Sequence, residues 1–249
     1  MICQPGGKGN GHMKKVLILQ HVWENSTGFV GEILRQHAIA YDLIHVETEP
    51  IPDPGAFDAV VAFGGSQHVY EEHKYPYFIQ EKVMIRKVIA QDIPYLGICL
   101  GGQLLAEVLE QGAVRQHTVK EFGFYNIALT EDGKKDRLYA GLPGYQKVFH
   151  WHEDVFDLPA GATLLATNDY AKNQAFRYRN AYGLQYHIEI DPAMLDTWLY
   201  HPNLQPESTD SQEIEAYKTI ERTRDQHFPL YREHTSIMFG NFLKICELI

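Results

Sequence analysis

The sequence is poor in the features that mark several classes of protein. Its 249 residues include only three cysteines, too few for a disulfide framework, which predicts a reducing, cytoplasmic setting. No segment approaches the roughly 18 apolar residues of a membrane span, and no basic stretch leads into an apolar block as in a secretory signal. The net charge is −10, so neither a nucleic acid nor a membrane is expected as a partner.

What the chain does contain is enough apolar material for a buried core. Hydrophobic residues make up 45% and aromatic residues 12% of the sequence, which excludes a disordered or coiled-coil protein. Residues 1–12 are glycine-rich and without periodicity, and we expect them to be an expression leader. We expect one main domain over 13–200 and a helical extension over 201–249 that packs on it.

Short apolar runs alternate with helical patterns in the first half of the chain. This alternation predicts an α/β fold with an open, doubly wound, mostly parallel sheet covered on both faces. Beyond about residue 113, short strands predict an extension of the sheet that is partly antiparallel. The expected strands are 16–19, 41–46, 59–63, 94–98, 124–129, 147–151, 162–167, 175–178 and 181–186, and the expected helices are 31–38, 78–90, 103–110, 191–200 and 212–249, the last after a polar linker at 202–211.

The most informative motif is Gly97-Ile98-Cys99-Leu100-Gly101-Gly102-Gln103, where a strand gives way to a helix. A nucleophile at such a turn needs very small neighbours two residues away on either side, which Gly97 and Gly101 supply. The helix N-terminus favours a thiolate at Cys99, and the amide of Leu100 is placed to stabilise an oxyanion. A buried cysteine before a glycine-rich turn is the alternative, and the strand–turn–helix context makes it weaker.

A cysteine nucleophile needs a base, and the base needs a group that orients it. His187 ends an apolar strand, and Glu189 follows on the same side of an extended chain. The carboxylate can therefore fix the imidazole tautomer and leave the other ring nitrogen for Cys99. Gly64-Gly65-Ser66 follows another strand, at the sheet edge where ligands bind in open α/β folds, and Gly65 can offer a second oxyanion donor.

These motifs, in this order, resemble those of the class I (triad-type) glutamine amidotransferases. The nucleophile motif around Cys99, the His187-Ile188-Glu189 segment and the glycines at 64 and 65 carry the resemblance, which covers roughly residues 13–200. It implies a flavodoxin-like fold. Two shorter segments, 121–124 and 151–154, resemble the substrate-holding segment and a His-x-Asp segment of the branch similar to the GMP-synthetase glutaminase, although a hydrogen-bonded loop explains His152 and Asp154 equally well.

The resemblance implies hydrolysis of the side-chain amide of L-glutamine through a glutamyl thioester on Cys99. His187 and Glu189 would complete the triad, and the amides of Gly65 and Leu100 would form the oxyanion hole. The substrate would be held by Gly64, Gln103, Gly123 and Phe124, and neither a metal nor an organic cofactor is expected.

Two residues depart from the family pattern: Ile188 stands where proline is usual, and Ser66 replaces a frequent proline. The chain also lacks the Ser-Gly-Gly-x-Asp-Ser loop of full GMP synthetases, so the ammonia would pass to a separate synthase subunit or be released. A γ-glutamyl peptidase or hydrolase that uses the same triad, and a partner-dependent regulatory or binding subunit, remain alternatives. The apolar residues Met238, Phe239 and Phe242 are expected to pack on the main domain rather than to form a docking stripe.

Overall fold

A computed structural model describes residues 14–22, 25–200 and 211–249. The expected leader and the expected linker at 202–211 therefore lie almost entirely outside the described residues. Within the described ranges, no helix combines the length and the hydropathy needed to cross a membrane.

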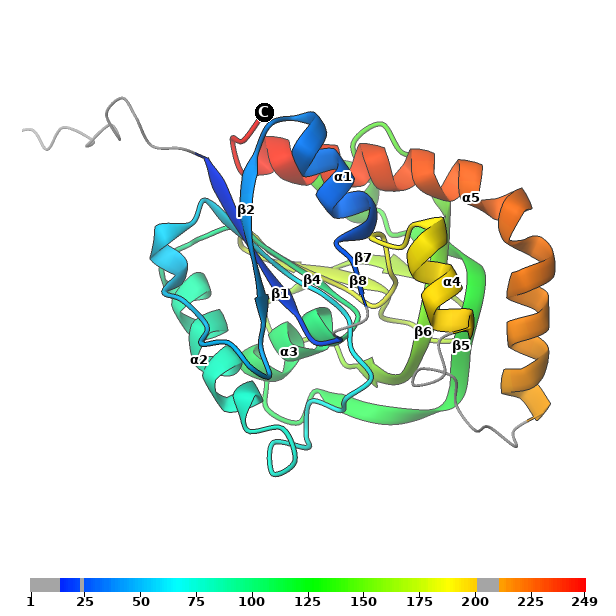
Figure 1. Ribbon diagram of the computed structural model, residues 1–249, viewed down its shortest axis with the longest axis horizontal. Coiled ribbons are helices and arrows are strands. Elements are labelled where there is room, and N and C mark those ends of the chain that lie inside the picture. The colour runs from blue at the N-terminus through cyan, green and yellow to red at the C-terminus, as the bar shows by residue number, and fades with distance from the viewer. Residues whose placement is uncertain (1–13, 23–24, 201–210) are drawn as a thin grey trace, which may run out of the picture.

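The core of the molecule is a sheet of nine strands in the order β2-β1-β3-β4-β9-β8-β7-β5-β6, counted over the described residues (Figure 1). Its parallel half consists of β1 (Lys15–Gln20), β2 (Ala40–His45), β3 (Ala59–Ala62), β4 (Tyr95–Ile98) and β9 (Ala181–Leu184). The antiparallel half consists of β5 (Val114–Leu129), β6 (Tyr145–Phe156), β7 (Thr163–Thr167) and β8 (Ala175–Tyr178), with β8 pairing to β9. The α/β fold is confirmed, and the antiparallel extension predicted beyond residue 113 makes the sheet mixed.

Helices cover both faces of the sheet, as a doubly wound fold requires. The helices are α1 (Gly28–Gln36), α2 (Tyr77–Ala90), α3 (Leu100–Leu109), α4 (Pro192–Tyr200) and α5 (Ser211–Ile245), with short 3-10 turns at Pro54–Ala56, Gly133–Lys135 and Arg137–Tyr139. Apolar residues of α1 and α5 pack against one face in a single cluster, and those of α2 and α3 pack against the other. The parallel strands alternate with helices, as predicted. Helices bury both faces of these strands, which is why the strands appear in the sequence as short apolar runs.

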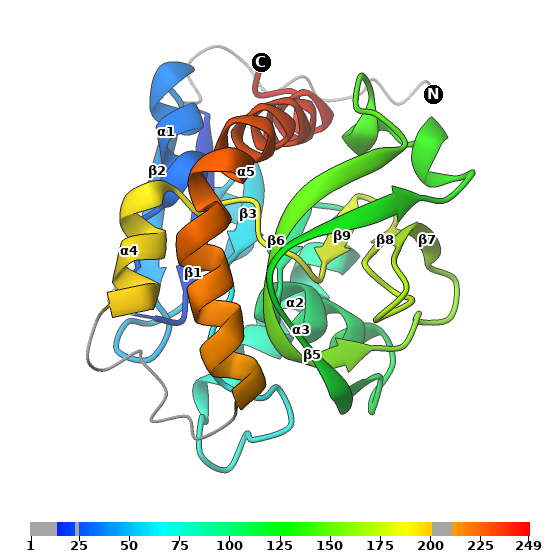
Figure 2. The same cartoon turned by 90° about the vertical axis from the view of Figure 1, so that its right-hand side faces the viewer.

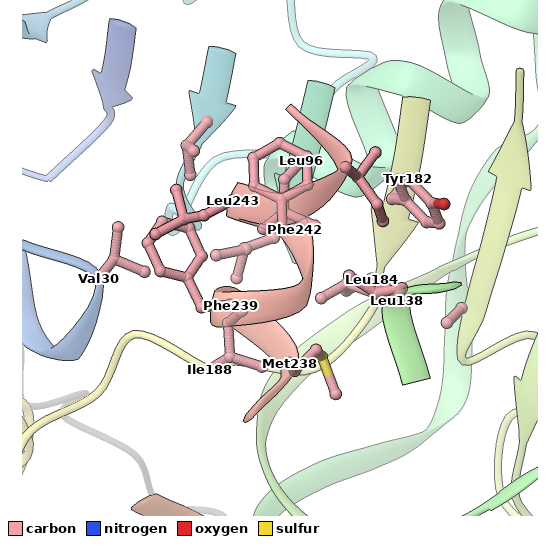
Figure 3. Packing of buried hydrophobic residues seen from close by; sticks show 14 of the residues in the cluster. Val30, Leu96, Leu138, Tyr182, Leu184, Ile188, Met238, Phe239, Phe242 and Leu243 are labelled. Carbon is pink, nitrogen blue, oxygen red and sulfur yellow. The ribbon is translucent and has the colours of Figure 1, made fainter. Parts of the chain in front are cut away.

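The long helix α5 bends in its middle, and its two halves contact different parts of the molecule (Figures 1 and 2). Pro229 lies inside the helix; proline removes a helical hydrogen bond and its ring crowds the preceding turn, which bends a helix. The second half contributes Met238, Phe239 and Phe242 to the core, each about 1% exposed or less (Figure 3). The expected core packing of these residues is therefore confirmed, and they form no exposed stripe.

Several elements differ in their bounds from the prediction: α1 begins at Gly28 rather than at residue 31, and β6 runs on to Phe156 rather than ending at residue 151. The helix α3 begins at Leu100, three residues earlier than expected, because its first turn is rich in glycine and lacks the apolar spacing of a helix. The strand β5 begins at Val114 instead of residue 124, and its pairing with β6 shifts register between Gln116 and Glu121. Such an irregularity interrupts the alternation of side chains by which a strand is recognised in a sequence.

Candidate active site

Cys99 lies on the sharp turn between β4 and α3, at the carboxyl edge of the parallel strands. Its backbone has φ 51° and ψ −109°, outside the regions that L residues usually adopt. The turn is held from both sides: the amide of Cys99 donates to the carbonyl of Leu184 (2.8 Å), and its carbonyl accepts from the amide of Gln103 (2.9 Å). Such strain persists only where the surroundings impose it, and it is typical of functional sites.

The small neighbours predicted on either side of Cys99 are required by close backbone approaches. A Cβ at Gly97 would lie 2.3 Å from the carbonyl oxygen of Gly101, and a Cβ at Gly101 would lie 2.3 Å from the carbonyl oxygen of Ala62. Both obstacles are backbone atoms of packed elements and cannot rotate away. The glycines therefore allow α3 to begin directly behind Cys99.

We expect Gly97→Ala to lower the free energy of unfolding by about 3 kcal/mol, because an extra methyl group must displace packed backbone. Urea unfolding followed by circular dichroism measures this change. Gly240→Ala is the matched control: its Cβ meets no atom within 4 Å, and it should stabilise α5 by about 0.5–1 kcal/mol. Equal stability of the two variants would contradict the packing described for Gly97.

His187 and Glu189 form a buried pair directly after β9. The Nδ1 atom of His187 lies 2.7 Å from Oε1 of Glu189, and both side chains are almost fully buried. The amide of Ile188 donates to the other carboxylate oxygen at 3.0 Å. A proline here, usual in the family that the sequence resembles, has no such N–H, so Ile188 adds a hydrogen bond that holds the carboxylate.

The ring of His187 approaches Cys99 across Gly64. A Cβ at Gly64 would lie 2.6 Å from Cε1 of His187 and 3.4 Å from Cβ of Cys99. Burial alone would lower the pKa of His187, but the Glu189 carboxylate and Cys99 outweigh it and raise the pKa to about 10. The Nε2 atom is buried without a hydrogen-bond partner within the described part of the chain. A protonated imidazole with one free nitrogen thus lies beside the thiol.

The two predicted oxyanion-hole residues lie side by side. A Cβ added to Gly65 would come within 2.7 Å of Cδ2 of Leu100. Leu100 opens α3 and Gly65 follows β3, so both amides belong to the edge of the sheet that carries Cys99. The fold therefore brings together Cys99, His187, Glu189, Gly64, Gly65 and Leu100, although the sequence spreads them over 126 positions.

A cavity of about 300 Å³, hereafter the Cys99 cavity, opens on the thiol. Its walls include Gln103, His68 and the acidic residues Glu153, Asp154 and Glu213. Lys120 pairs with two of these carboxylates, Glu153 and Glu213, so three acidic groups face one lysine, and this excess of negative charge suits a substrate that carries an ammonium group.

The predicted substrate-binding residues are placed unequally around this cavity. Gln103 lines it, and its side-chain amide donates to the carbonyl of Asp154 at 3.2 Å. Gly123 and Phe124 are not among the lining residues, and Phe122 is. Phe124 turns away and packs its ring on Phe149, at 5.0 Å between centroids.

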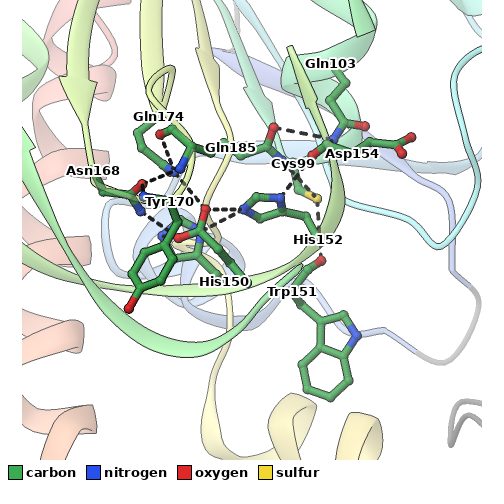
Figure 4. A network of polar contacts seen from close by, with 12 residues as sticks. Cys99, Gln103, His150, Trp151, His152, Asp154, Asn168, Tyr170, Gln174 and Gln185 are labelled. Atoms are coloured by element: carbon green, nitrogen blue, oxygen red, sulfur yellow. Dashed lines mark hydrogen bonds and ion pairs between the residues drawn. The ribbon is translucent and has the colours of Figure 1, made fainter. Parts of the chain in front are cut away.

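A buried polar cluster of Glu121, His150 and His152 lies behind the cavity. Nε2 of His152 is 3.2 Å from one oxygen of Glu121, and Nδ1 of the same ring is 3.0 Å from the carbonyl of Asp154. The amides of Asn168 and Gln174 donate to the Glu121 carboxylate at 2.6 and 3.0 Å. Figure 4 shows His150, His152, Asn168 and Gln174 of this network, with His152 on the side towards Cys99. The cluster ties β5 to β6, on which His152 and Asp154 line the cavity.

This cluster is the group, among the described residues, that could hold a metal ion, since its ligand atoms lie within 4.8 Å of one another. Burial would raise the pKa of Glu121, but the hydrogen bond from His152 helps to lower it to about 2, so the residue is a carboxylate. Burial also lowers the pKa of His150 to about 3, which leaves that ring neutral. Nε2 of His152 faces Glu121, and the amides of Asn168 and Gln174 donate to the same carboxylate. These contacts satisfy Glu121 from within the chain.

Sequence reasoning missed the contribution of the two last helices to the site. Glu213 and Tyr217 of α5 line the Cys99 cavity, where Glu213 pairs with Lys120 and Tyr217 packs edge-on against Trp151 at 5.0 Å. Trp198 of α4 packs edge-on against His187 at 5.1 Å. No spacing in the sequence connects these positions to the nucleophile motif, so only the folded arrangement reveals them.

Sequence comparisons find related proteins along most of the chain. The sequence model of the family described as glutamine amidotransferase class-I matches residues 31–204. The chain is 31% identical over 203 residues to a glutamine amidotransferase-like protein, YfeJ, of Salmonella typhimurium, covering 80% of this chain and 84% of that protein. It is 32% identical over 165 residues to one of the subunits of the glutamine-hydrolysing GMP synthase of Sulfolobus acidocaldarius, covering 62% of this chain and 83% of that protein.

Comparison with solved structures finds proteins of the same kind. A glutamine amidotransferase from Thermotoga maritima superposes with a TM-score of 0.79 at 29% identity, covering 95% of this chain and all of that one. A glutamine amidotransferase from Methylobacillus flagellatus, at 22% identity, supports the fold alone, with a TM-score of 0.78 and coverage of 94% and 95%.

Proposed function

Because the chain belongs to the class-I glutamine amidotransferase family, we propose that it hydrolyses the side-chain amide of L-glutamine through a thioester on Cys99. The observation that carries the proposal is the contact of His187 with both Glu189 (2.7 Å) and, across Gly64, Cys99. A nucleophile, a base and a group that orients the base are the parts that this chemistry needs. The family consists of enzymes with a cysteine nucleophile.

In the acylation step, Sγ of Cys99 attacks the amide carbonyl carbon of glutamine. The negative charge that develops on the carbonyl oxygen is stabilised by the amides of Gly65 and Leu100. The tetrahedral adduct then collapses: the C–N bond breaks, the nitrogen takes a proton from Nε2 of His187, and ammonia leaves.

In the deacylation step, His187 removes a proton from water, whose oxygen attacks the thioester carbon. The C–S bond breaks and glutamate leaves, and His187 keeps the proton taken from water, which restores the imidazolium beside the Cys99 sulfur. Glu189 keeps Nδ1 protonated throughout, so that Nε2 alone exchanges protons with the substrate. The carboxylates of the Cys99 cavity would attract the α-ammonium group of glutamine, and Gln103 would lie beside the bound substrate.

Trapping the thioester tests this proposal directly. With L-glutamine and hydroxylamine, the enzyme should form γ-glutamyl hydroxamate, because hydroxylamine competes with water for the thioester. The hydroxamate is measured as its iron complex, and the sum of hydroxamate and glutamate should equal the ammonia released from glutamine. Ammonia release without any hydroxamate would contradict a covalent intermediate.

We further propose that a separate synthase subunit receives the ammonia, as the similarity to a GMP synthase subunit suggests, and that the activity is cytoplasmic. If the purified protein hydrolyses glutamine only after such a subunit is added, its activity depends on that partner. The second candidate, a γ-glutamyl hydrolase with the same triad, is favoured by a specific observation, the cavity next to His187 described below.

A further inference from the structure

Two separate cavities flank the proposed triad, one on each side. The Cys99 cavity includes the thiol but not the imidazole. A second cavity, hereafter the His187 cavity, includes the imidazole but not the thiol. The two share Gly65, Ser66 and Trp151 as a common wall. A substrate bound across Cys99 and His187 therefore lies at the border of both cavities.

The chemistry of acyl transfer decides which part of the substrate enters each cavity. The carbonyl carbon must reach Cys99, so the glutamyl part occupies the Cys99 cavity. The leaving nitrogen must reach Nε2 of His187 to take up its proton. A substituent on that nitrogen therefore continues into the His187 cavity, whereas glutamine itself, which releases ammonia, places nothing there.

The walls of the His187 cavity are apolar. Val22 and the rings of Trp151 and Trp198 form much of its surface. The Nε1 atom of Trp198 donates to the side-chain oxygen of Asn25 at 2.6 Å, so it is not available to a ligand. His187 is the sole ionisable group among the described residues that line it. Unlike the Cys99 cavity, the His187 cavity has no carboxylate among the described residues of its wall.

The size of the cavity limits the group that it can hold. Its volume is about 100 Å³, somewhat less than the roughly 150 Å³ of an apolar cavity that binds benzene. A chain of about three or four carbon atoms fits such a space, whereas an amino acid with its charged carboxylate does not suit apolar walls.

We propose that the His187 cavity is a leaving-group subsite for short alkyl amines, so that γ-glutamyl alkylamides are cleaved in preference to glutamine. The inference rests on the proposed triad chemistry. Water and the alkylamide give glutamate and the free amine: the amide C–N bond breaks, His187 protonates the nitrogen, and water then cleaves the thioester.

A series of amide substrates tests the subsite. Measured kcat/KM should rise from glutamine through γ-glutamyl methylamide, ethylamide, propylamide and butylamide by about fourfold per added carbon, and should rise no further for hexylamide, whose outer carbons project beyond the cavity. Butylamine should also inhibit glutamine hydrolysis as a product more strongly than methylamine. A series that is flat or that falls from glutamine onward, with glutamine still hydrolysed, would overturn the subsite and leave the proposed function intact.

A variant whose larger side chain fills the His187 cavity gives an independent test. Val22→Phe should lower the ratio of kcat/KM for butylamide to that for glutamine at least tenfold, because the ring occupies the space of the alkyl chain. Val83→Phe, the same change at a half-exposed position of α2, should leave the ratio as it is. An unchanged ratio in a folded Val22→Phe protein would contradict the subsite. If no γ-amide, glutamine included, reacted faster than with Cys99→Ala, the proposed function itself would fail.

Discussion

Replacing Cys99 with alanine should reduce glutamine hydrolysis by about 10⁴-fold or more, down to the level of the uncatalysed background. Without Sγ no thioester can form, and the remaining groups only bind and polarise the substrate. The measurement is ammonia and glutamate release from L-glutamine, in parallel with the wild-type protein. The fold should remain, since alanine keeps the Cβ atom and leaves a gap of one sulfur atom.

The matched control is Cys246→Ala, which removes the other described thiol. Cys246 directly follows α5 and packs against the core. Burial raises the pKa of its thiol, so it is unreactive, and it lines neither of the two cavities. This variant should lose some stability and keep its turnover. Undiminished hydrolysis by Cys99→Ala, or its loss in Cys246→Ala with the fold intact, would contradict the assignment of the nucleophile.

Replacing Glu189 with glutamine should lower kcat by about 10³- to 10⁴-fold, the second largest effect that we expect. The amide keeps the size of the side chain but removes the negative charge that stabilises the His187 cation. It can also present its NH₂ group to Nδ1, which favours the wrong tautomer of the ring. Kinetics with L-glutamine at neutral pH measure the change.

The pH dependence of the same variant separates this electrostatic role from simple loss of packing. The folded pKa of His187, about 10, lies above its ordinary value of 6.5, so the stabilisation by the Glu189–His187 pair is complete below pH 6.5 and is lost as the pH rises towards 10. The alkaline limb of kcat/KM should therefore lie near pH 10 in the wild type and at lower pH in Glu189→Gln. Glu131→Gln, which changes an exposed carboxylate, should not move it, and an unshifted limb in Glu189→Gln would contradict the pairing.

The sequence predicts those parts of this molecule that have a local cause. Apolar runs and helical spacing define the parallel half of the sheet, because its strands are buried on both faces. The nucleophile turn is recognisable because steric limits around Cys99 permit only glycine at two fixed positions, 97 and 101. His187 and Glu189 are recognisable because they are two residues apart on one extended segment.

The parts that the sequence does not predict depend on contacts between distant residues. The register shift in β5 conceals ten residues of that strand. The contact between Glu121 and His152 connects two strands, and neither residue alone differs from an ordinary polar side chain. The walls that α4 and α5 contribute through Trp198 and Tyr217 arise from the packing of helices, for which no motif exists.

The bend at Pro229 has a consequence for synthesis on the ribosome. The second half of α5 completes the core around Ile188, next to His187 (Figure 3), and the first half supplies a wall of the Cys99 cavity. A nascent chain that has emerged only as far as α4 therefore carries Cys99, His187 and Glu189 in an unfinished core with apolar surface exposed. Such a chain is prone to aggregation, and we expect the site around Cys99 to be complete only once α5 has docked.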